Sequence, residues 1–191
     1  MTAAHDSVEQ VIAATERWLE KAVIGLGLCP FAERAHRRKL IRYRVSAQDS
    51  TIGLLDELGE ELLHLRATDP RVCETSLLIH PRVLGDFDDY NQFLDEADAT
   101  VLALGMSGEL QIASFHPHYR FAGAAPDDVG NYTNRSPYPM LHLLREASVT
   151  RAVAEFPDTT EIGARNAATL RALGLAGWRA LWSDAEIVDG R

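Results

Sequence analysis

The chain has 191 residues, of which 46% are hydrophobic and 25% are charged, proportions that are ordinary for a globular protein. This length predicts one domain over residues 1–191 with a core of its own. No apolar run approaches the roughly 20 residues of a membrane-spanning helix, and no secretory signal opens the chain, so we expect a cytoplasmic protein with no membrane partner. A net charge of −9 argues against nucleic-acid binding, which needs a broad basic surface.

The basic residues are concentrated in one segment, RAHRRKLIRYR. Six of them lie there: Arg34, Arg37, Arg38, Lys39, Arg42 and Arg44. Two interpretations of this segment remain open. It could bind an anion or the acidic surface of a partner, or it could be a charged rim that faces water.

Helices and strands are expected to alternate in the first half of the chain. Apolar residues recur on one helical face over about 6–23, before glycines and Pro30 end the pattern. The segment 40–45, LIRYRV, alternates as a half-buried strand does. A second helix with a leucine-rich stripe is expected over 50–66, and 75–80, TSLLIH, is a short apolar strand.

The second half of the chain is predicted to contain one more strand and three helices. An apolar helical face covers 87–101, and the strand follows at 109–116. Ser136 suits the N-cap of a helix that continues through MLHLLREASV. The last helix is expected to begin at a capping box over 158–161 and to end at Gly174.

This order of elements favours an α/β fold, with a small central sheet of three or four strands flanked by about five helices. An α+β arrangement with an antiparallel edge strand remains an alternative.

Two of the predicted strands end in the same way, at His80-Pro81 and at His116-Pro117. Proline cannot donate a ladder hydrogen bond, so each histidine is the last residue of its strand. If the two strands are parallel neighbours, both imidazoles lie at the sheet edge where open α/β folds bind ligands. In that case His116 and His80 are candidate general acids or bases. Alternatively, each ring caps a backbone carbonyl where its strand ends.

A metal site is a further alternative. His116 and His118 are two residues apart, which on an extended backbone places both rings on one side. With His80 they would supply three imidazoles, enough for a catalytic metal ion with an open position. No HExxH motif or Cys/His finger accompanies them, and the sequence specifies no cofactor.

The loop after the third strand is long and carries residues that bind anions. Long ordered loops are usually functional, and this one leads to a predicted helix start, whose N–H groups and dipole attract anions. Arg135 beside that start could bind phosphate or carboxylate with two hydrogen bonds, although the asparagines and the serine could also serve only as turn and cap residues. The candidate substrate-binding residues are Tyr119, Arg120, Asn131, Asn134, Arg135, Ser136 and Arg145.

On the predicted helix that follows, His142 and Glu146 are four residues apart and would share one face. They could orient an imidazole toward a pocket as part of a catalytic set, or they could form a surface pair.

Cys29, in GLGLCPFA, is the candidate reactive thiol. A catalytic thiol needs a pKa that a nearby cation or helix start lowers. A small buried cysteine with a purely structural role is the alternative.

Three of these segments, VIGLGLCPFA, SFHPHYRFAG and NYTNRSPYPMLHLLREASV, together resemble the signatures of the family catalogued as domain of unknown function 1415. The resemblance runs from about Trp18 to about Ala154, and it implies relatives in bacteria and plants but no reaction. Gly27 stands where the family pattern often has a polar residue, and His118 is less fixed in that pattern. The matching positions are Cys29, Pro30, Phe31, His116, Pro117, Tyr119, Phe121, Ala122, Gly123, Asn131, Asn134, Arg135, Ser136, Pro137, Tyr138, Pro139, His142, Arg145 and Glu146.

We therefore expect an enzyme, a hydrolase, transferase or isomerase, that acts on a small metabolite bearing a phosphate or carboxylate. Histidine would be the general acid or base, and arginine and asparagine would bind the anion. A non-catalytic ligand-sensing or partner-binding module and a metal-dependent hydrolase are the alternatives. The enzyme hypothesis requires that His80, His116, Arg135 and His142 surround one cavity.

Overall fold

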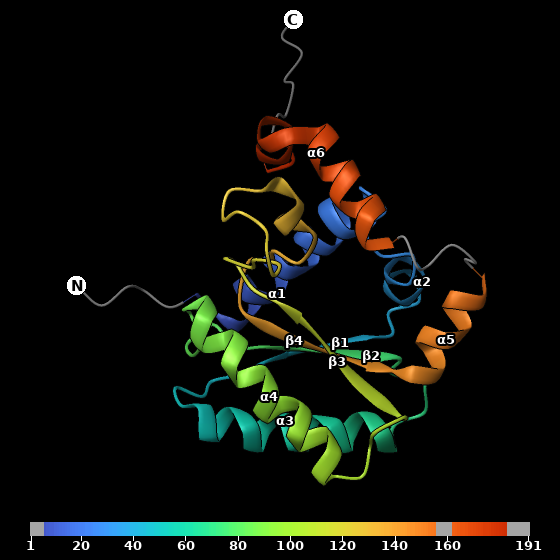
Figure 1. Cartoon of the computed structure of the whole chain (residues 1–191). Helices are drawn as coiled ribbons and strands as arrows, with labels where there is room; N and C mark the ends of the chain where they lie inside the picture. The colour runs from blue at the N-terminus through green and yellow to red at the C-terminus, as the bar shows by residue number, and fades with distance from the viewer. Residues whose placement is uncertain (1–5, 156–161, 183–191) are drawn as a thin grey trace, which may run out of the picture.

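The computed structural model describes residues 6–155 and 162–182, which form a four-stranded sheet with helices on both faces (Figure 1). This confirms the predicted α/β fold. The strands lie side by side in the order β1 (Ile41–Val45), β2 (Thr75–Ile79), β4 (Met140–Arg145) and β3 (Leu110–Phe115). β1 and β2 are parallel, whereas β4 is antiparallel to both β2 and β3. The antiparallel strand is therefore inside the sheet, not at its edge.

β4 corrects the sequence prediction, because residues 140–145 form a strand and not part of a helix that begins at Ser136. β4 lies between two other strands, with a hydrophobic cluster on each face of the sheet. A strand covered on both faces is a nearly continuous apolar run, and such a run does not distinguish a strand from a buried helix. The helix α5 begins only at Glu146 and spans Glu146–Glu155.

Two helices, α3 (Thr51–Ala67) and α4 (Phe87–Ala103), cover one face of the sheet (Figure 1). Their leucine and aromatic side chains pack against the inward residues of β2, β3 and β4. Both helices begin at side-chain caps: Ser50 accepts a hydrogen bond from a backbone N–H of α3, and Asp86 accepts from the N–H groups of Asp88 and Asp89.

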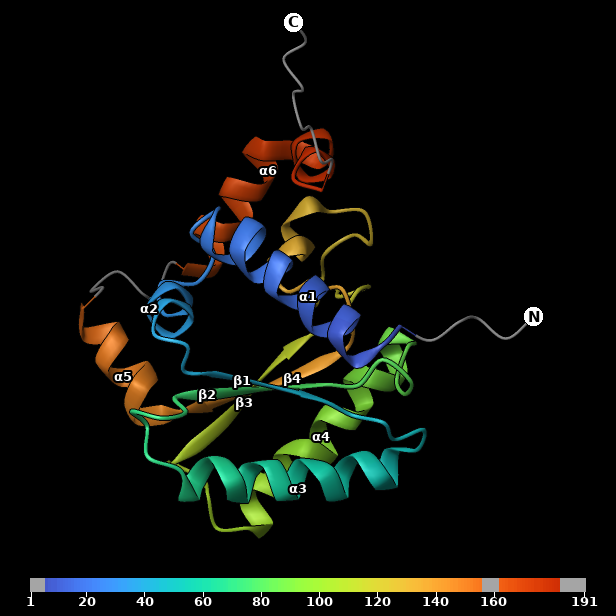
Figure 2. The ribbon, with the colours of Figure 1, turned by 180° about the vertical axis from the view of Figure 1, so that it is seen from behind.

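The opposite face carries α1 (Val8–Trp18), the π-helix η1 (Leu19–Ile24), α2 (Ala32–Arg37) and α6 (Ile162–Ala180), as Figure 2 shows from behind. α6 packs on a short 3-10 helix, η2 (Val129–Thr133), which belongs to the long loop between β3 and β4.

The predicted end of the last helix coincides with a kink in α6. Gly174 adopts φ 67° and ψ 172°, which are not helical values, so one helical segment ends there and a second continues to Ala180. The capping box predicted over 158–161 lies outside the described residues. Within the part of the chain that the structure describes, no helix has the length and apolar character needed to cross a bilayer.

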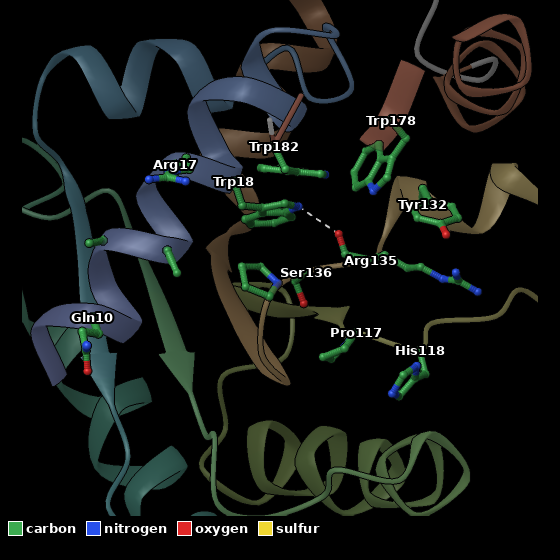
Figure 3. Close-up of a pocket in the computed structure, with 13 residues that line it drawn as sticks. Gln10, Arg17, Trp18, Pro117, His118, Tyr132, Arg135, Ser136, Trp178 and Trp182 are labelled. Atoms are coloured by element: carbon green, nitrogen blue, oxygen red, sulfur yellow. Dashed lines mark hydrogen bonds between the residues drawn. The ribbon is translucent and has the colours of Figure 1, made fainter. Parts of the chain in front are cut away.

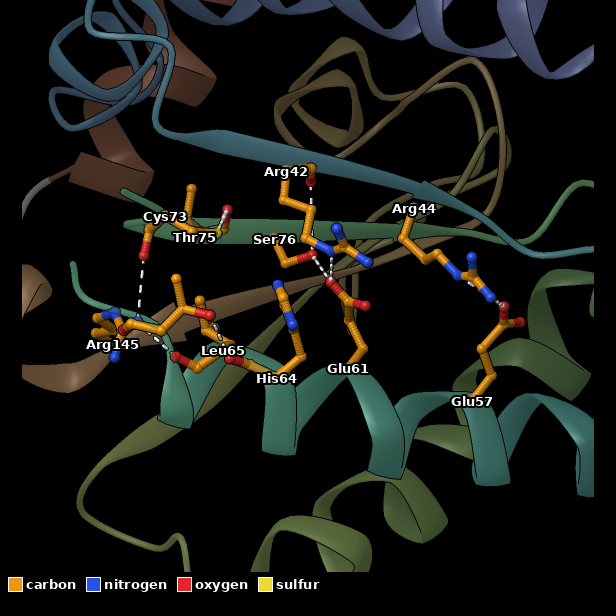
Figure 4. A network of polar contacts seen from close by, with 11 residues as sticks. Arg42, Arg44, Glu57, Glu61, His64, Leu65, Cys73, Thr75, Ser76 and Arg145 are labelled. Atoms are coloured by element: carbon orange, nitrogen blue, oxygen red, sulfur yellow. Dashed lines mark hydrogen bonds and ion pairs between the residues drawn. The ribbon is translucent and has the colours of Figure 1, made fainter. Parts of the chain in front are cut away.

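The basic segment RAHRRKLIRYR is divided between the two faces of the sheet. Arg42 and Arg44 on β1 point to α3, where each lies 2.6 Å from a buried glutamate, Glu61 or Glu57 (Figure 4). The Ser76 hydroxyl donates a further hydrogen bond to Glu61. The other basic residues belong to α2 or the turn after it, so the segment does not form one continuous anion-binding surface.

Candidate functional site

His80 and His116 lie at the same edge of the sheet, where β2 and β3 end. The two strands run in the same direction but are not neighbours, because β4 lies between them. Tyr90 of α4 fills the space between the two imidazoles, with ring-centre distances of 5.8 Å to His80 and 5.0 Å to His116. Its hydroxyl accepts the Phe115 N–H at 3.1 Å and donates to the Met140 carbonyl at 2.9 Å.

The His80 ring is fully buried and serves a backbone turn. Its Nδ1 lies 3.0 Å from the carbonyl oxygen of Val83, so Nδ1 carries the proton and donates it. Nε2 is buried and has no hydrogen-bond partner among the described residues. Burial lowers the pKa of His80 to about 4 and keeps the ring neutral at pH 7. Because no atom of the residue is exposed, a substrate in solution does not reach it.

Both ring nitrogens of His116 are also bound to backbone. Nδ1 accepts the N–H of His118 at 3.0 Å, which leaves Nε2 to donate to the Leu84 carbonyl at 3.1 Å. Burial lowers the pKa of this imidazole as well. In this structure, therefore, His80 and His116 hold carbonyls beyond their strand ends, which is the structural alternative to general acid–base catalysis.

The predicted three-histidine metal site is not formed. Among residues 6–155 and 162–182, no group of three histidine, cysteine or acidic side chains is placed to hold a metal ion. The rings of His116 and His118 are 5.8 Å apart, but both nitrogens of His116 are already occupied.

His142 and Glu146 do not share a helical face, because His142 belongs to β4 and Glu146 begins α5. His142 Nε2 lies 2.7 Å from the hydroxyl of Thr75, which itself donates to the Leu143 carbonyl at 2.6 Å. His142 Nε2 is therefore the donor of this pair. Burial lowers the pKa of His142 to about 4, so the ring is a neutral member of the sheet interior.

Arg145 lies on the α3 side of the sheet and caps that helix. Its Nη2 donates to the carbonyls of Leu65 and Thr68 at the end of α3 and to that of Cys73 (Figure 4). A cation at a helix C-terminus also interacts favourably with the helix dipole. The structure thus separates Arg145 from the loop residues with which it was grouped.

The polar side chains of the loop between β3 and β4 mainly bind the loop's own backbone. Asn131, which is fully buried, accepts the Phe121 N–H and donates to the Ala125 carbonyl. The amide of Asn134 donates to the Ser114 carbonyl, and the hydroxyl of Ser136 donates to the Tyr138 carbonyl. The Tyr119 hydroxyl accepts a hydrogen bond from the Ser114 hydroxyl, and Arg120 pairs with Asp88 at 3.2 Å.

The thiol of Cys29 packs against the hydrophobic cluster between the sheet and α6. Burial raises its pKa, whereas a catalytic thiol needs a lowered one.

A cavity of about 770 Å³ opens beside this loop, and we call it the tryptophan pocket (Figure 3). All three tryptophans of the chain line it: Trp18 at the end of α1, and Trp178 and Trp182 from α6 and the turn after it. Tyr132 of η2 adds a fourth aromatic ring. Trp18 is fixed by a 2.8 Å hydrogen bond from its indole N–H to the Arg135 carbonyl.

The charged side chains that line the tryptophan pocket are cationic. They are Arg17 and Arg135, and none of the thirteen described lining residues, which include His118, is an aspartate or glutamate. The whole chain has a net charge of −9, so the charge of this lining is opposite in sign to the net charge of the chain. The pocket is therefore suited to a negatively charged ligand.

Arg135 is the one predicted ligand-binding residue that lines this pocket with its charge available. Its guanidinium lies over the Tyr132 ring at 4.3 Å from the ring centre, and it donates to the carbonyls of Tyr119 and Pro126. No carboxylate among the described residues is within ion-pair distance of it. Those two bonds use two of the five N–H groups of an arginine, which leaves three for a ligand.

A second cavity, of about 560 Å³, lies next to the first one at the start of α4, and we call it the α4 pocket. Asp86, Asp88 and Arg120 line it, and His118 and Arg135 line both cavities. Arg120 and Arg135, which were predicted to bind an anion together with Asn134, both line this cavity with His118, whereas His80, His116 and His142 do not line either pocket.

The sequence reasoning missed the aromatic residues of the site. It assigned Trp18 to a core-facing stripe, which its 4% exposure confirms, and gave no role to Trp178 or Trp182. The residue type of the last two was an available signal, because tryptophan combines a large apolar body with a polar N–H.

The comparisons with known proteins identify the family of the chain but indicate no activity. The family model described as "Protein of unknown function (DUF1415)" matches residues 10–180 and confirms the resemblance seen in the three motifs. No curated protein and no solved structure matches the chain.

Proposed function

Because the chain belongs to the DUF1415 family, whose description states no activity, we propose a function from the site itself: the tryptophan pocket binds a small molecule that combines a planar aromatic ring with an anionic group. The observation that carries this proposal is the lining, which joins all three tryptophans to two arginines and has no acidic side chain among the residues that the structure describes. A cavity of about 770 Å³ is within the usual size range of small-molecule sites.

The aromatic walls favour a planar ligand. The rings form a connected group: Trp178 packs edge-to-face on Trp182 and on Tyr132, with ring-centre distances of 5.4 Å and 4.8 Å, and Trp18 lines the same pocket (Figure 3). Indole and phenol rings stack on other aromatic rings and contribute beyond the apolar area that they bury. An aliphatic anion would not use these faces, so the lining selects for a ring.

The anion would bind at Arg135. Its guanidinium is already held against Tyr132 and by two carbonyls, so little side-chain entropy is lost when a ligand binds. A guanidinium with unused N–H groups binds phosphate or carboxylate through two parallel hydrogen bonds. Arg17 lies on the other side of Trp18 and adds positive charge to the same opening (Figure 3).

His118 supports an enzymatic form of this proposal. It is exposed and lines both pockets, and its ring makes no hydrogen bond to the described residues, whereas its backbone N–H is fixed by His116. A general acid or base must reach the ligand, which His118 can do and the buried His80 and His116 cannot. We therefore assign the proton-transfer role to His118.

Tryptophan fluorescence tests the binding proposal directly, because every tryptophan of the chain lines the pocket. Matched pairs of anion and neutral analogue, such as indole-3-acetate with indole-3-acetamide and AMP with adenosine, separate ring binding from charge recognition. We expect a saturable change with the anions, and we expect Arg135→Gln to weaken binding at least tenfold. The control Arg37→Gln, on the exposed face of α2, should change the affinity less than twofold.

Two outcomes would refute the proposal. One is the absence of a saturable signal with any aromatic anion. The other is equal binding of the acid and its neutral analogue together with no effect of Arg135→Gln. Catalysis is tested separately: His118→Ala should abolish conversion of any ligand that the wild-type protein turns over, and it should weaken binding less than Arg135→Gln does. A sensing module would bind the same ligand without converting it.

A further inference from the structure

The tryptophan pocket and the α4 pocket share one wall. His118 and Arg135 line both cavities, so a ligand group bound to Arg135 is at the entrance of the α4 pocket as well. Arg135 donates to the carbonyl of Pro126, which lines the α4 pocket, while its guanidinium lies over Tyr132, which lines the other. A ligand that extends past this arginine passes from one cavity to the next.

Buried contacts fix the walls of the α4 pocket. His80 and His116 hold the consecutive carbonyls of Val83 and Leu84, immediately before Gly85 and Asp86 enter the wall. The other nitrogen of His116 accepts the N–H of His118 on the opposite wall. One buried ring thus connects the two sides of the pocket.

The turn that these rings hold is strained. Leu84 has φ 59°, a conformation that a bulky residue rarely adopts. Such conformations persist only where surrounding contacts enforce them, and they cluster at functional sites. The strained turn and its two imidazole contacts fix the part of the wall that Gly85 and Asp86 contribute.

The α4 pocket is lined by both negatively and positively charged side chains. Asp86 and Asp88 face the same cavity as Arg120 and Arg135. Asp88 pairs with Arg120, and both side chains remain open to solvent, at 73% and 43% exposure. A second anion would meet two carboxylates there, whereas hydroxyl groups can donate to the carboxylates and accept from the guanidiniums. The lining is therefore suited to a polyhydroxylated group.

We infer that one ligand occupies both pockets, with an aromatic ring among the tryptophans, the phosphates at the shared wall of His118 and Arg135, and a sugar in the α4 pocket. The ligand class is a sugar nucleotide. This inference rests on the proposed function and specifies its substrate class.

The test compares whole and truncated ligands. UDP-glucose and ADP-glucose are titrated alongside UDP and ADP, with binding measured by calorimetry and by tryptophan fluorescence. We expect a sugar nucleotide to bind at least tenfold more tightly than its diphosphate. Asp88→Ala should abolish this difference, whereas the neighbouring Asp89→Ala, an exposed acid outside the pocket, should preserve it. Trp182→Ala should weaken both ligands equally.

The outcomes distinguish this inference from the proposed function. Equal affinities for the whole and truncated ligands would overturn the inference, as would a sugar-dependent gain that survives Asp88→Ala. Binding of indole-3-acetate without binding of any nucleotide would also overturn it and would leave the proposed function intact. If no aromatic anion bound at all, the result would refute both the inference and the proposed function.

Discussion

Replacement of His80 by asparagine should make the stability of the protein less sensitive to acid. His80 is fully buried, its Nδ1–H binds the Val83 carbonyl, and its Nε2 has no partner in the described structure. An asparagine amide can supply a donor near the position of Nδ1 but does not titrate. His80→Asn therefore keeps a donor for the turn and removes the ionisable ring.

The expected magnitude follows from the pKa of His80, which burial lowers from 6.5 to about 4. Between these two values the unfolded chain binds a proton that the folded protein does not, so stability falls as the pH falls. Integration over this pKa difference gives a loss of about 2 kcal/mol between pH 7 and pH 5, with most of the effect below pH 6.5. At pH 5 most carboxylates are still ionised, so acid titration of those groups contributes little.

Urea unfolding followed by circular dichroism at pH 7 and pH 5 measures this effect. Loss of the ring beside Tyr90 will lower the stability of the variant at both pH values, so the informative quantity is the change between them. The wild-type protein should lose about 2 kcal/mol more than His80→Asn over this range. Other titrating groups, including His116 and His142, are common to both proteins and cancel in the comparison. Equal losses, within about 0.5 kcal/mol, would refute the assignment of His80 as a buried neutral ring.

Three further predictions concern side chains that the structure assigns to architecture. Tyr90→Phe removes a hydroxyl with two backbone partners and should lower the free energy of unfolding by about 2 kcal/mol in urea titrations; no change would show that these bonds contribute nothing. Arg145→Met removes the cap of α3 and should cost about 2–3 kcal/mol in the same assay, against less than about 0.5 kcal/mol for the exposed control Arg66→Gln. Cys29 should react with a disulfide reagent much more slowly in native than in urea-unfolded protein, whereas rapid native labelling would contradict a raised thiol pKa.

Most helices and strands could be predicted from the sequence because one face of each packs on the core and the other faces solvent. The helices over 51–67 and 87–103 have one apolar side and one exposed side, so their period is visible in the residues. The strand at 140–145 is central and covered on both faces, so its apolar run carries no period. A local signal was present in Pro139, because a proline disfavours helical backbone at the residue before it. That signal argues for an extended entry at Tyr138 and against a helix that starts at Ser136.

The site was less predictable because it depends on contacts between distant segments. Arg135 and Arg120 stood out as charged residues in a long loop, and both line a cavity. Trp18 and Trp178 are largely buried and belong to the hydrophobic core, so only their assembly with Trp182 around a cavity distinguishes them from other core residues. Trp18 and Trp182 are more than 160 residues apart in the chain, a relation that no local pattern contains.

The family motifs show why polar residues in a loop do not by themselves identify a catalytic site. A long segment without a helix or sheet ladder has backbone N–H and C=O groups that still need partners. Asn131, Asn134, Ser136 and His116 supply those partners, and each uses its hydrogen-bonding capacity in doing so. The groups left for a ligand are those with unused capacity: three N–H groups of Arg135, the exposed ring of His118 and the aromatic faces around them. The proposal that the tryptophan pocket binds a ligand therefore rests on the hydrogen-bonding capacity that remains after the backbone is satisfied, and not on residue type.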